Sequence, residues 1–304
     1  MKLLTLINPN ARGGKSREEL GDIENIYRKY GLESDFEITE NQDAVFSLIQ
    51  KTDLPAYSGI IAAGGDGSFF TLVNAVMKKN PLERISLGIL PVGTGNSLAR
   101  EFESPTEGIE EFVKIIADGK TSGIDLAKVE TNEETFYFAN MMGFGFITDV
   151  SATAAKLKMF GKLSYTLGVV YNTIKLNTFD LDIEIDGKKQ IMDNVFVIVS
   201  NSRYTGGDYL IAPKAKINDG KLDLIILNRL SRLHLLQTFP KIFDGSHINT
   251  PYVDYIQAES ILLKAKTPKV LSPDGEVYGH FPAKISVVPQ ALQVFGEVKG
   301  IVDK

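Results

Sequence analysis

Three glycine-rich turns carry the residues that are best suited to chemistry in this chain. They read Asn-Pro-Asn-Ala-Arg-Gly-Gly-Lys at residues 8–15, Gly-Gly-Asp-Gly-Ser at 64–68 and Gly-Thr-Gly-Asn at 93–96. Each turn directly follows a short apolar run that is typical of a buried strand. In open parallel sheets, ligands bind where such turns expose backbone N–H groups at the carboxyl ends of the strands. One glycine turn is often only structural, but three on successive strands predict a nucleotide site.

Charged side chains in the first two turns suit phosphate chemistry. Arg12 and Lys15 supply cations for phosphate oxygens, although their spacing is not that of a Walker A loop. Asp66 places a carboxylate among glycines, at the predicted start of a helix. Such a carboxylate could hold magnesium through water or accept the proton of an attacking hydroxyl, two roles that phosphoryl transfer requires. The structural alternative is that Asp66 caps the helix that follows it.

The elements that must position these turns alternate between strand and helix patterns in the first part of the chain. Apolar runs predict strands at residues 3–7, 36–38, 59–63 and 85–90, and amphipathic patterns between them predict helices. This alternation predicts a parallel sheet covered by helices, which we assign to an α/β nucleotide-binding domain at residues 1–126.

The second part of the chain has a different pattern. Longer strands with alternating apolar residues are separated by Asp-Gly and Gly-Gly turns, and the clearest predicted hairpin turns at Asp186-Gly187. One helical segment is expected at about residues 150–176. We therefore predict an antiparallel β domain at residues 127–289. The last predicted strand, Leu292 to Phe295, could pair with either domain, and residues 290–304 are candidates to return to the first.

Composition excludes several classes of function. A formal charge of −5 argues against nucleic-acid binding, which usually needs a basic face. The absence of cysteine excludes disulfides and thiolate metal sites and is natural in a reducing cytosol, while the three histidines lack ligand spacing. No run of eighteen apolar residues occurs, so no membrane-spanning segment is expected. A lipid substrate would have to be reached at the membrane surface.

Taken together, the turns resemble those of the diacylglycerol kinase catalytic domain family, which includes bacterial diacylglycerol kinases and the sphingosine and ceramide kinases. Residues 8–15, 64–68, 91–96 and the Pro-Asp-Gly-Glu motif at 273–276 match its four main motifs in order, so the resemblance covers nearly the whole chain. It implies an N-terminal domain like those of NAD kinases and phosphofructokinases, followed by an antiparallel β-sandwich that receives a lipid. It also implies transfer of the γ-phosphate of ATP, with Mg²⁺, to a hydroxyl of diacylglycerol, ceramide or a sphingoid base.

The resemblance implies roles for individual residues. Asp66 and Asp274 are alternative proton acceptors, between which the sequence does not choose, and Asp125 matches a second acid near the metal waters. The residues that match nucleotide contacts are Asn8, Asn10, Gly14, Lys15, Thr39, Gly65, Gly67, Ser68, Gly93, Thr94, Asn96, Lys158 and Glu276. Lys158 matches a phosphate-binding arginine of sphingosine kinases, although Lys156, Lys158 and Lys162 could equally form a solvated helix face.

The same resemblance implies substrate and metal contacts. Phe146 and Asp149 lie in a segment similar to the lipid-binding region of sphingosine kinases, but Ser151 stands where those enzymes carry an acid for the sphingoid amine. Bacterial members hold a structural magnesium through an aspartate at the position of Asp219 and carbonyls at those of Lys216 and Lys221. Hard cations accept such oxygen ligands, and the same residues would also form an ordinary hairpin turn.

Two departures from the family pattern leave alternatives open. Ser68 replaces a threonine and keeps its hydroxyl, whereas Ser97 replaces an acid that bacterial diacylglycerol kinases use in the magnesium-water network. The rival hypotheses are an NAD kinase and a catalytically silent lipid-binding regulatory protein of the same fold. By resemblance we expect a cytoplasmic protein that associates peripherally with membranes, and homodimerisation is implied by resemblance alone.

Overall fold

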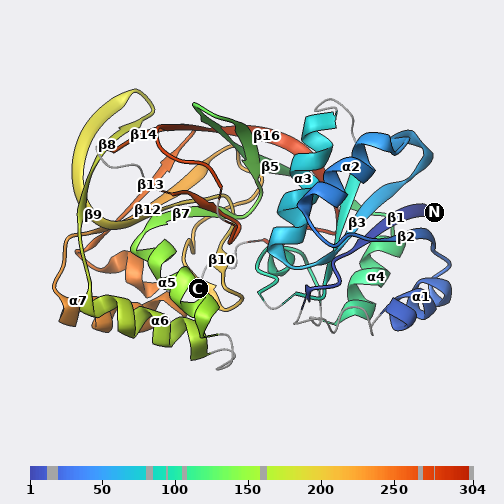
Figure 1. Ribbon diagram of the computed structural model, residues 1–304, viewed down its shortest axis with the longest axis horizontal. Helices are drawn as coiled ribbons and strands as arrows, with labels where there is room; N and C mark the ends of the chain where they lie inside the picture. The colour runs from blue at the N-terminus through green and yellow to red at the C-terminus, as the bar shows by residue number, and fades with distance from the viewer. Residues whose placement is uncertain are drawn as a thin grey trace. The chain divides into compact units, whose positions relative to one another are not determined.

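The computed structural model describes residues 1–11, 20–79, 85–93, 95–104, 108–157, 163–265, 270–276 and 278–300. The chain divides into two compact units (Figure 1). Unit 1 comprises Met1–Leu126, Ile217–Asp219 and Val288–Lys304, and unit 2 comprises Ala127–Lys216 and Gly220–Val287. Two strands, β5 (Thr121–Thr131) and β16 (Ala283–Phe295), have residues in both units.

Unit 1 contains the parallel sheet that the sequence predicts. Its strand order is β2-β1-β3-β4 followed by the carboxyl-terminal part of β16, and all of these neighbours pair in parallel. The strands are β1 (Lys2–Ile7), β2 (Glu33–Ile38), β3 (Gly59–Gly64) and β4 (Ser86–Pro91). The helical elements are α1 (Leu20–Lys29), α2 (Gln42–Lys51), η2 (Leu54–Ala56), α3 (Asp66–Lys79), η3 (Leu98–Glu101) and α4 (Ile109–Ala117).

The helices of unit 1 cover both faces of this sheet. Figure 1 shows α2 and α3 together on one side of the strands and α1 and α4 on the other. Side chains between the layers are fully buried, among them Leu3, Ile60, Ile61 and Leu87. Since parallel strands all end at the same edge, the residues that follow β1, β3 and β4 are brought together there.

Two backbone segments approach each other closely where β3 and β4 end. The N–H of Gly93 donates to the carbonyl oxygen of Gly64 at 3.1 Å. A Cβ atom at Gly93 would lie 2.4 Å from Cα of Gly65 and 2.8 Å from its nitrogen. Because both neighbours are main-chain atoms that cannot rotate away, only glycine fits at residue 93.

We expect Gly93→Ala to lower the free energy of unfolding by about 1–3 kcal/mol, because the added methyl group overlaps the main chain. Urea or thermal unfolding measures the change. The matched control is Gly21→Ala in α1, where a Cβ would meet nothing within 4 Å and alanine favours the helix. Equal stabilities of the two variants would contradict the close approach at residues 65 and 93.

Unit 2 is built on antiparallel strands. The order β13-β12-β9-β8-β14 continues into the amino-terminal part of β16, while β7 pairs with β9 and β15, and β6 with β5. The strands are β6 (Thr135–Phe138), β7 (Met141–Gly145), β8 (Phe179–Ile185), β9 (Lys188–Ser200), β10 (Tyr204–Thr205), β11 (Tyr209–Leu210), β12 (Leu222–Asn228), β13 (Val253–Ala258), β14 (Ser260–Lys264) and β15 (Ser272–Pro273). The predicted hairpin at Asp186-Gly187 is confirmed, and both residues have positive φ, 45° and 81°, as a type I′ turn requires.

A layer of helices packs on the strands of unit 2. It consists of α5 (Phe146–Lys156), α6 (Leu163–Ile174), α7 (Arg232–Thr238), η5 (Phe239–Ile242) and η6 (Ser246–Asn249). The single helical segment expected at 150–176 is therefore two helices, and the first begins earlier, at Phe146. A buried apolar cluster joins this layer to β9, β12 and β13 and includes Val150, Val169, Leu227 and Leu235.

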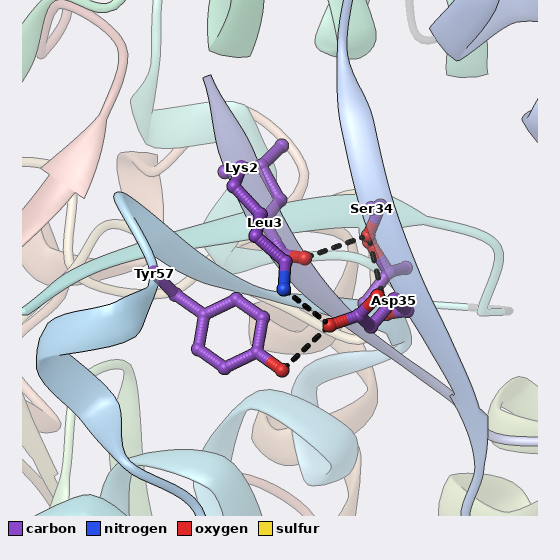
Figure 2. Close-up of polar contacts among 6 residues, drawn as sticks. Lys2, Leu3, Ser34, Asp35 and Tyr57 are labelled. Carbon is purple, nitrogen blue, oxygen red and sulfur yellow. Dashed lines mark hydrogen bonds and ion pairs between the residues drawn. The ribbon is translucent and has the colours of Figure 1, made fainter.

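A polar cluster joins β1 and β2 near their amino-terminal ends in unit 1 (Figure 2). The Tyr57 hydroxyl donates to Oδ2 of Asp35 at 2.7 Å, and Nζ of Lys2 lies 3.1 Å from the same oxygen. Ser34 Oγ donates to the carbonyl oxygen of Leu3 at 3.2 Å. The Tyr57 hydrogen bond, followed by that from Lys2, lowers the pKa of Asp35, and Asp35 raises the pKa of Tyr57 to about 12.

We expect Tyr57→Phe to raise the pKa of Asp35 towards its ordinary value, because the largest stabilising contact of the carboxylate is removed. A carboxyl ¹³C NMR titration measures this. Since the folded pKa is lowered, the contribution of Asp35 to stability is present above its unfolded pKa and is lost as the pH falls through the folded value. Tyr30→Phe is the control, because the Tyr30 hydroxyl bonds Glu110 instead; an Asp35 pKa that moved equally in both variants would contradict this assignment.

Candidate functional site

The first two turns of unit 1 are joined by a side-chain hydrogen bond. Nδ2 of Asn8, which follows β1, donates to Oγ of Ser68 at 3.0 Å. Oδ1 of Asn8 accepts from the N–H of Asn10 at 2.9 Å, and the main chain of Asn8 donates to Ala63 at the end of β3. The predicted convergence of the strand-end turns is therefore present, and Ser68 uses the hydroxyl that it shares with threonine.

Asp66 connects the second turn to the third. It is the first residue of α3, yet its Oδ2 accepts from the N–H of Ser97 and its Oδ1 from the N–H of Leu98, each at 3.0 Å. The carboxylate thus receives amides at the start of η3, so a simple cap of its own helix does not describe its role. Ser97 is fully buried beside it.

The environment of Asp66 alters its acidity. Burial of the carboxylate raises its pKa, and the hydrogen bonds from the Leu98 and Ser97 amides and from the Ser97 side chain act in the opposite direction. Desolvation is the larger effect, so the carboxyl group holds its proton more tightly than a solvated aspartate does. A carboxylate of raised pKa at a cluster of strand-end turns is a candidate for proton transfer.

The third turn is held by Asn96, whose φ is 48°. Nδ2 of Asn96 donates to the carbonyl oxygens of Pro91 and Gly93, both at 3.0 Å, and its Oδ1 accepts from the N–H of Gly93 at 3.0 Å. Asn96 therefore has a structural role in shaping this turn. The sequence showed the asparagine, but not this function.

Of the remaining predicted nucleotide contacts, some belong to the described part of the chain and others do not. Thr39 is buried after β2, and its N–H donates to Ile7 at the end of β1 at 2.9 Å, so it lies at the same edge as Asn8. Gly67 accepts at its carbonyl oxygen from the Thr71 hydroxyl at 2.9 Å within α3. The predicted contacts Gly14, Lys15, Thr94 and Lys158 lie outside the described residues.

Asp125 joins three distant segments of unit 1. Its side chain is fully buried, its Oδ1 accepts from the N–H of Gln290 at 2.8 Å, and its own N–H donates to Ile217 at 2.8 Å. Gln290 has a positive φ of 51°. The carboxylate therefore stabilises a strained turn within β16, in addition to any role near a metal.

The predicted structural metal site is an exposed turn. Asp219 and the flanking Lys216 and Lys221 are exposed, and Gly220 has a φ of 74°. Among the residues that the structure describes, no three carboxylate or histidine side chains gather into a metal cluster. A cation here would depend on main-chain carbonyl oxygens beside Asp219, as the family resemblance implies.

In unit 2, the Pro-Asp-Gly-Glu motif forms a tight turn after β15. Asp274 and Gly275 have φ of 48° and 88°, and the N–H of Glu276 donates to Pro273 at 2.8 Å. The buried Asp274 accepts from the N–H of Met141 through Oδ1 at 2.9 Å and donates its own N–H to Met141 at 2.8 Å. Burial raises the pKa of Glu276. The motif is therefore anchored to β7 by its aspartate.

Unit 2 also holds an apolar pocket of about 50 Å³ between its helical layer and its strands. Phe146 forms part of the wall, whereas Asp149, on the same helix, is exposed. Other walls come from Val169, Phe196, Leu227, Leu235 and Phe239, which sequence analysis did not single out. None of the described lining residues is Asp, Glu, Lys or Arg, and burial lowers the pKa of His247, the one histidine among them.

None of the helices in the described part of the chain has the length and apolarity needed to span a bilayer.

Comparison with known proteins gives two family matches. The model described as "Diacylglycerol kinase catalytic domain" matches residues 2–129, and the model described as "YegS C-terminal NAD kinase beta sandwich-like domain" matches residues 140–296.

Individual relatives agree with these matches. A protein named diacylglycerol kinase from Mycobacterium tuberculosis (strain H37Rv) is 32% identical over 238 residues, which cover 77% of this chain and 75% of the relative. Another of that name from Bacillus subtilis (strain 168) is 28% identical over 282 residues, covering 92% and 91%. A solved structure of a diacylglycerol kinase from Bacillus anthracis (strain Sterne) shares the fold, with a TM-score of 0.72, 23% identity and 97% coverage of both chains.

These matches confirm the resemblance and the predicted fold, a parallel α/β domain followed by a β-sandwich-like domain. The chain belongs to the diacylglycerol kinase catalytic domain family.

Proposed function

We propose that this protein is a lipid kinase that transfers the γ-phosphate of ATP to a hydroxyl of a lipid such as diacylglycerol. The observation that carries the proposal is the carboxylate of Asp66, desolvated and oriented by two main-chain amides where the strands of a parallel sheet end. The names of the relatives point to the same chemistry.

The strand-end turns of unit 1 are the proposed ATP site. Main-chain N–H groups around Gly65 and Gly67 would bind phosphate oxygens. The turns would be shaped by Asn8, Asn10, Thr39, Ser68, Gly93 and Asn96, and further contacts would come from Gly14, Lys15, Thr94, Lys158 and Glu276. The amides of Ser97 and Leu98 and the Ser97 side chain donate to the Asp66 carboxylate, which has about four lone-pair sites. The remaining site is suited to a water ligand of Mg²⁺, so the residue fits a water-mediated metal site.

The acceptor hydroxyl must lose a proton as the phosphoryl group arrives. Asp66 and Asp274 are the two candidates to receive it, and we propose that Asp125 supports the metal waters. When bound, Mg²⁺ would offset the charge that develops on the transferred phosphoryl group. We retain Asp219, with the carbonyls of Lys216 and Lys221, as a second and purely structural Mg²⁺ site.

The apolar pocket of unit 2 favours a lipid acceptor over NAD. Its lining, with Phe146 on α5, offers hydrocarbon surface and none of the charged side chains that a dinucleotide phosphate would need. We propose that the pocket takes part of an acyl chain and that Asp149, exposed at the start of the same helix, contacts the polar part of the lipid.

The proposal is tested by phosphate incorporation from γ-labelled ATP with diacylglycerol, monoacylglycerol, ceramide, sphingosine and NAD offered separately. We expect label in an acylglycerol or ceramide, with no label in NAD. Transfer to NAD would instead establish an NAD kinase. ATP binding without transfer to any acceptor would favour a silent protein of the same fold.

We expect Asp66→Asn to reduce kcat by about 100-fold or more, because the amide loses the charge and its NH₂ group opposes the N–H donors of Ser97 and Leu98. Labelled-phosphate transfer and ATP titration measure turnover and binding separately. Because the active form is ionised and the pKa of Asp66 is raised, transfer by the parent protein should fall as the pH is lowered through that pKa.

The matched control is Asp35→Asn, which alters an exposed acid near the amino-terminal ends of β1 and β2. We expect this variant to keep the turnover of the parent protein. If Asp66→Asn also turned over lipid at the parental rate, the proposed site would be wrong.

A further inference from the structure

The helical layer of unit 2 has an apolar outer face. Four side chains of α6 are exposed there, from Leu167 at 39% to Val170 at 50%, Tyr171 at 51% and Ile174 at 66%. The neighbouring segment adds Leu233, Leu236 and Phe243. Together these seven residues, which we call the α6–α7 face, make up most of the eleven large apolar side chains that are exposed in the described part of the chain.

Six members of the α6–α7 face lie on α6 and α7, and the seventh, Phe243, directly follows η5. Helix α6 contacts α7, and α7 contacts η5, and Figure 1 shows α6 and α7 next to each other in the helical layer. Val169 of α6 and Leu235 of α7 point into one buried cluster. Helix α6 therefore presents apolar residues both to the core and to the outside, an arrangement expected of a helix whose outer side meets an apolar medium.

Within the segments that carry this face, residues 163–179 and 229–243, the charged side chains are all positive, while the exposed Asp244 directly follows Phe243. Lys175, Arg232 and Lys241 are exposed, and neither residues 163–179 nor residues 229–243 contain Asp or Glu. Nζ of Lys175 lies 5.4 Å from the centre of the Tyr171 ring. The chain as a whole carries a formal charge of −5, so these segments depart from the charge of the rest of the protein.

We propose that the α6–α7 face docks the protein on an anionic lipid bilayer. Exposed apolar side chains with a tyrosine and flanking cations are the composition of helices that lie in the membrane interface. A second copy of the chain fits less well, because the exposed cations Lys175, Arg232 and Lys241 outnumber the neighbouring acid Asp244, so a twofold contact would bring mostly like charges together.

Docking through this face would have a consequence for the apolar pocket. Val169 and Leu235 line that pocket from the inner side of the same two helices. A bilayer in contact with their outer side would therefore be separated from the pocket by a single layer of helix. Membrane docking goes beyond the proposed kinase activity and does not depend on it.

Co-sedimentation with vesicles tests the proposal without ATP or any phosphate acceptor. We expect the full chain to bind vesicles of phosphatidylcholine mixed with phosphatidylglycerol, to bind phosphatidylcholine vesicles more weakly, and to be released from the anionic vesicles by salt.

Surface substitutions locate the contact. Val170→Ser with Ile174→Ser should weaken binding about tenfold or more, because apolar area is lost from the interface. Leu233→Ser with Leu236→Ser, on the other helix, should do the same. The control is Ile191→Ser on β9, which alters an even more exposed apolar residue, at 76%, outside this face, and thermal unfolding checks that each variant is folded.

The cations are tested by Lys175→Gln with Lys241→Gln, which should weaken binding to anionic vesicles about tenfold or more and reduce its salt dependence. Lys188→Gln with Lys189→Gln, at the β8–β9 hairpin, is the charge-matched control and should bind as the parent does.

Two results would overturn the docking proposal. The first is an absence of vesicle binding, or binding that the α6 and α7 variants leave unchanged. The second is a dimer, detected by light scattering, that the same variants dissociate, which would assign the face to a second copy of the chain. If the parent protein docked but transferred no phosphate, the proposed function would fail while the docking surface stood.

Discussion

The site in unit 1 depends on one carboxylate that binds two main-chain amides from a different turn. Asp66 receives the N–H groups of Ser97 and Leu98, and these contacts orient the acid and the start of η3 together. A carboxylate that is shielded from water costs free energy unless such donors satisfy its oxygens. The acid, the close approach of Gly65 and Gly93, and the Asn8–Ser68 bond therefore form one connected arrangement. We therefore expect a change in one of its members to disturb the others.

The same acids that suggest chemistry also maintain the local structure. Asp125 binds the amide of Gln290, and Asp274 binds that of Met141. In each case an oxygen is held by a main-chain donor far away in sequence, which limits the motion of the side chain. Such restraint suits a group that must meet a phosphate or a hydroxyl in a defined position, because little reorganisation is then needed during the reaction. Structural and catalytic roles are compatible for these residues.

Sequence patterns predicted the parallel and antiparallel parts, the hairpin at 186–187 and the three strand-end turns, because these depend on local periodicity and on glycine. They did not predict the partners of Asp66, which lie about thirty residues away and depend on how β3 and β4 pair. The start of α5 at Phe146 was missed because the preceding Gly145 adopts a φ of 85°, which sequence alone does not reveal. The outer residues of α6 were assigned no function, since an apolar helix is usually explained by burial.

Unit 1 is assembled from segments that lie far apart in the chain, and this affects the order in which the protein folds. Its sheet includes the end of β16, whose residues Gln293 and Val294 pair with Ser86 and Leu87 of β4, and it also includes the turn at 217–219. During synthesis the first 126 residues leave the ribosome with one flank of β4 still unpaired. That flank can be covered only after all of unit 2 has been made. A nascent chain must therefore carry an incomplete sheet for most of translation, a stage at which exposed strand edges invite association with other chains.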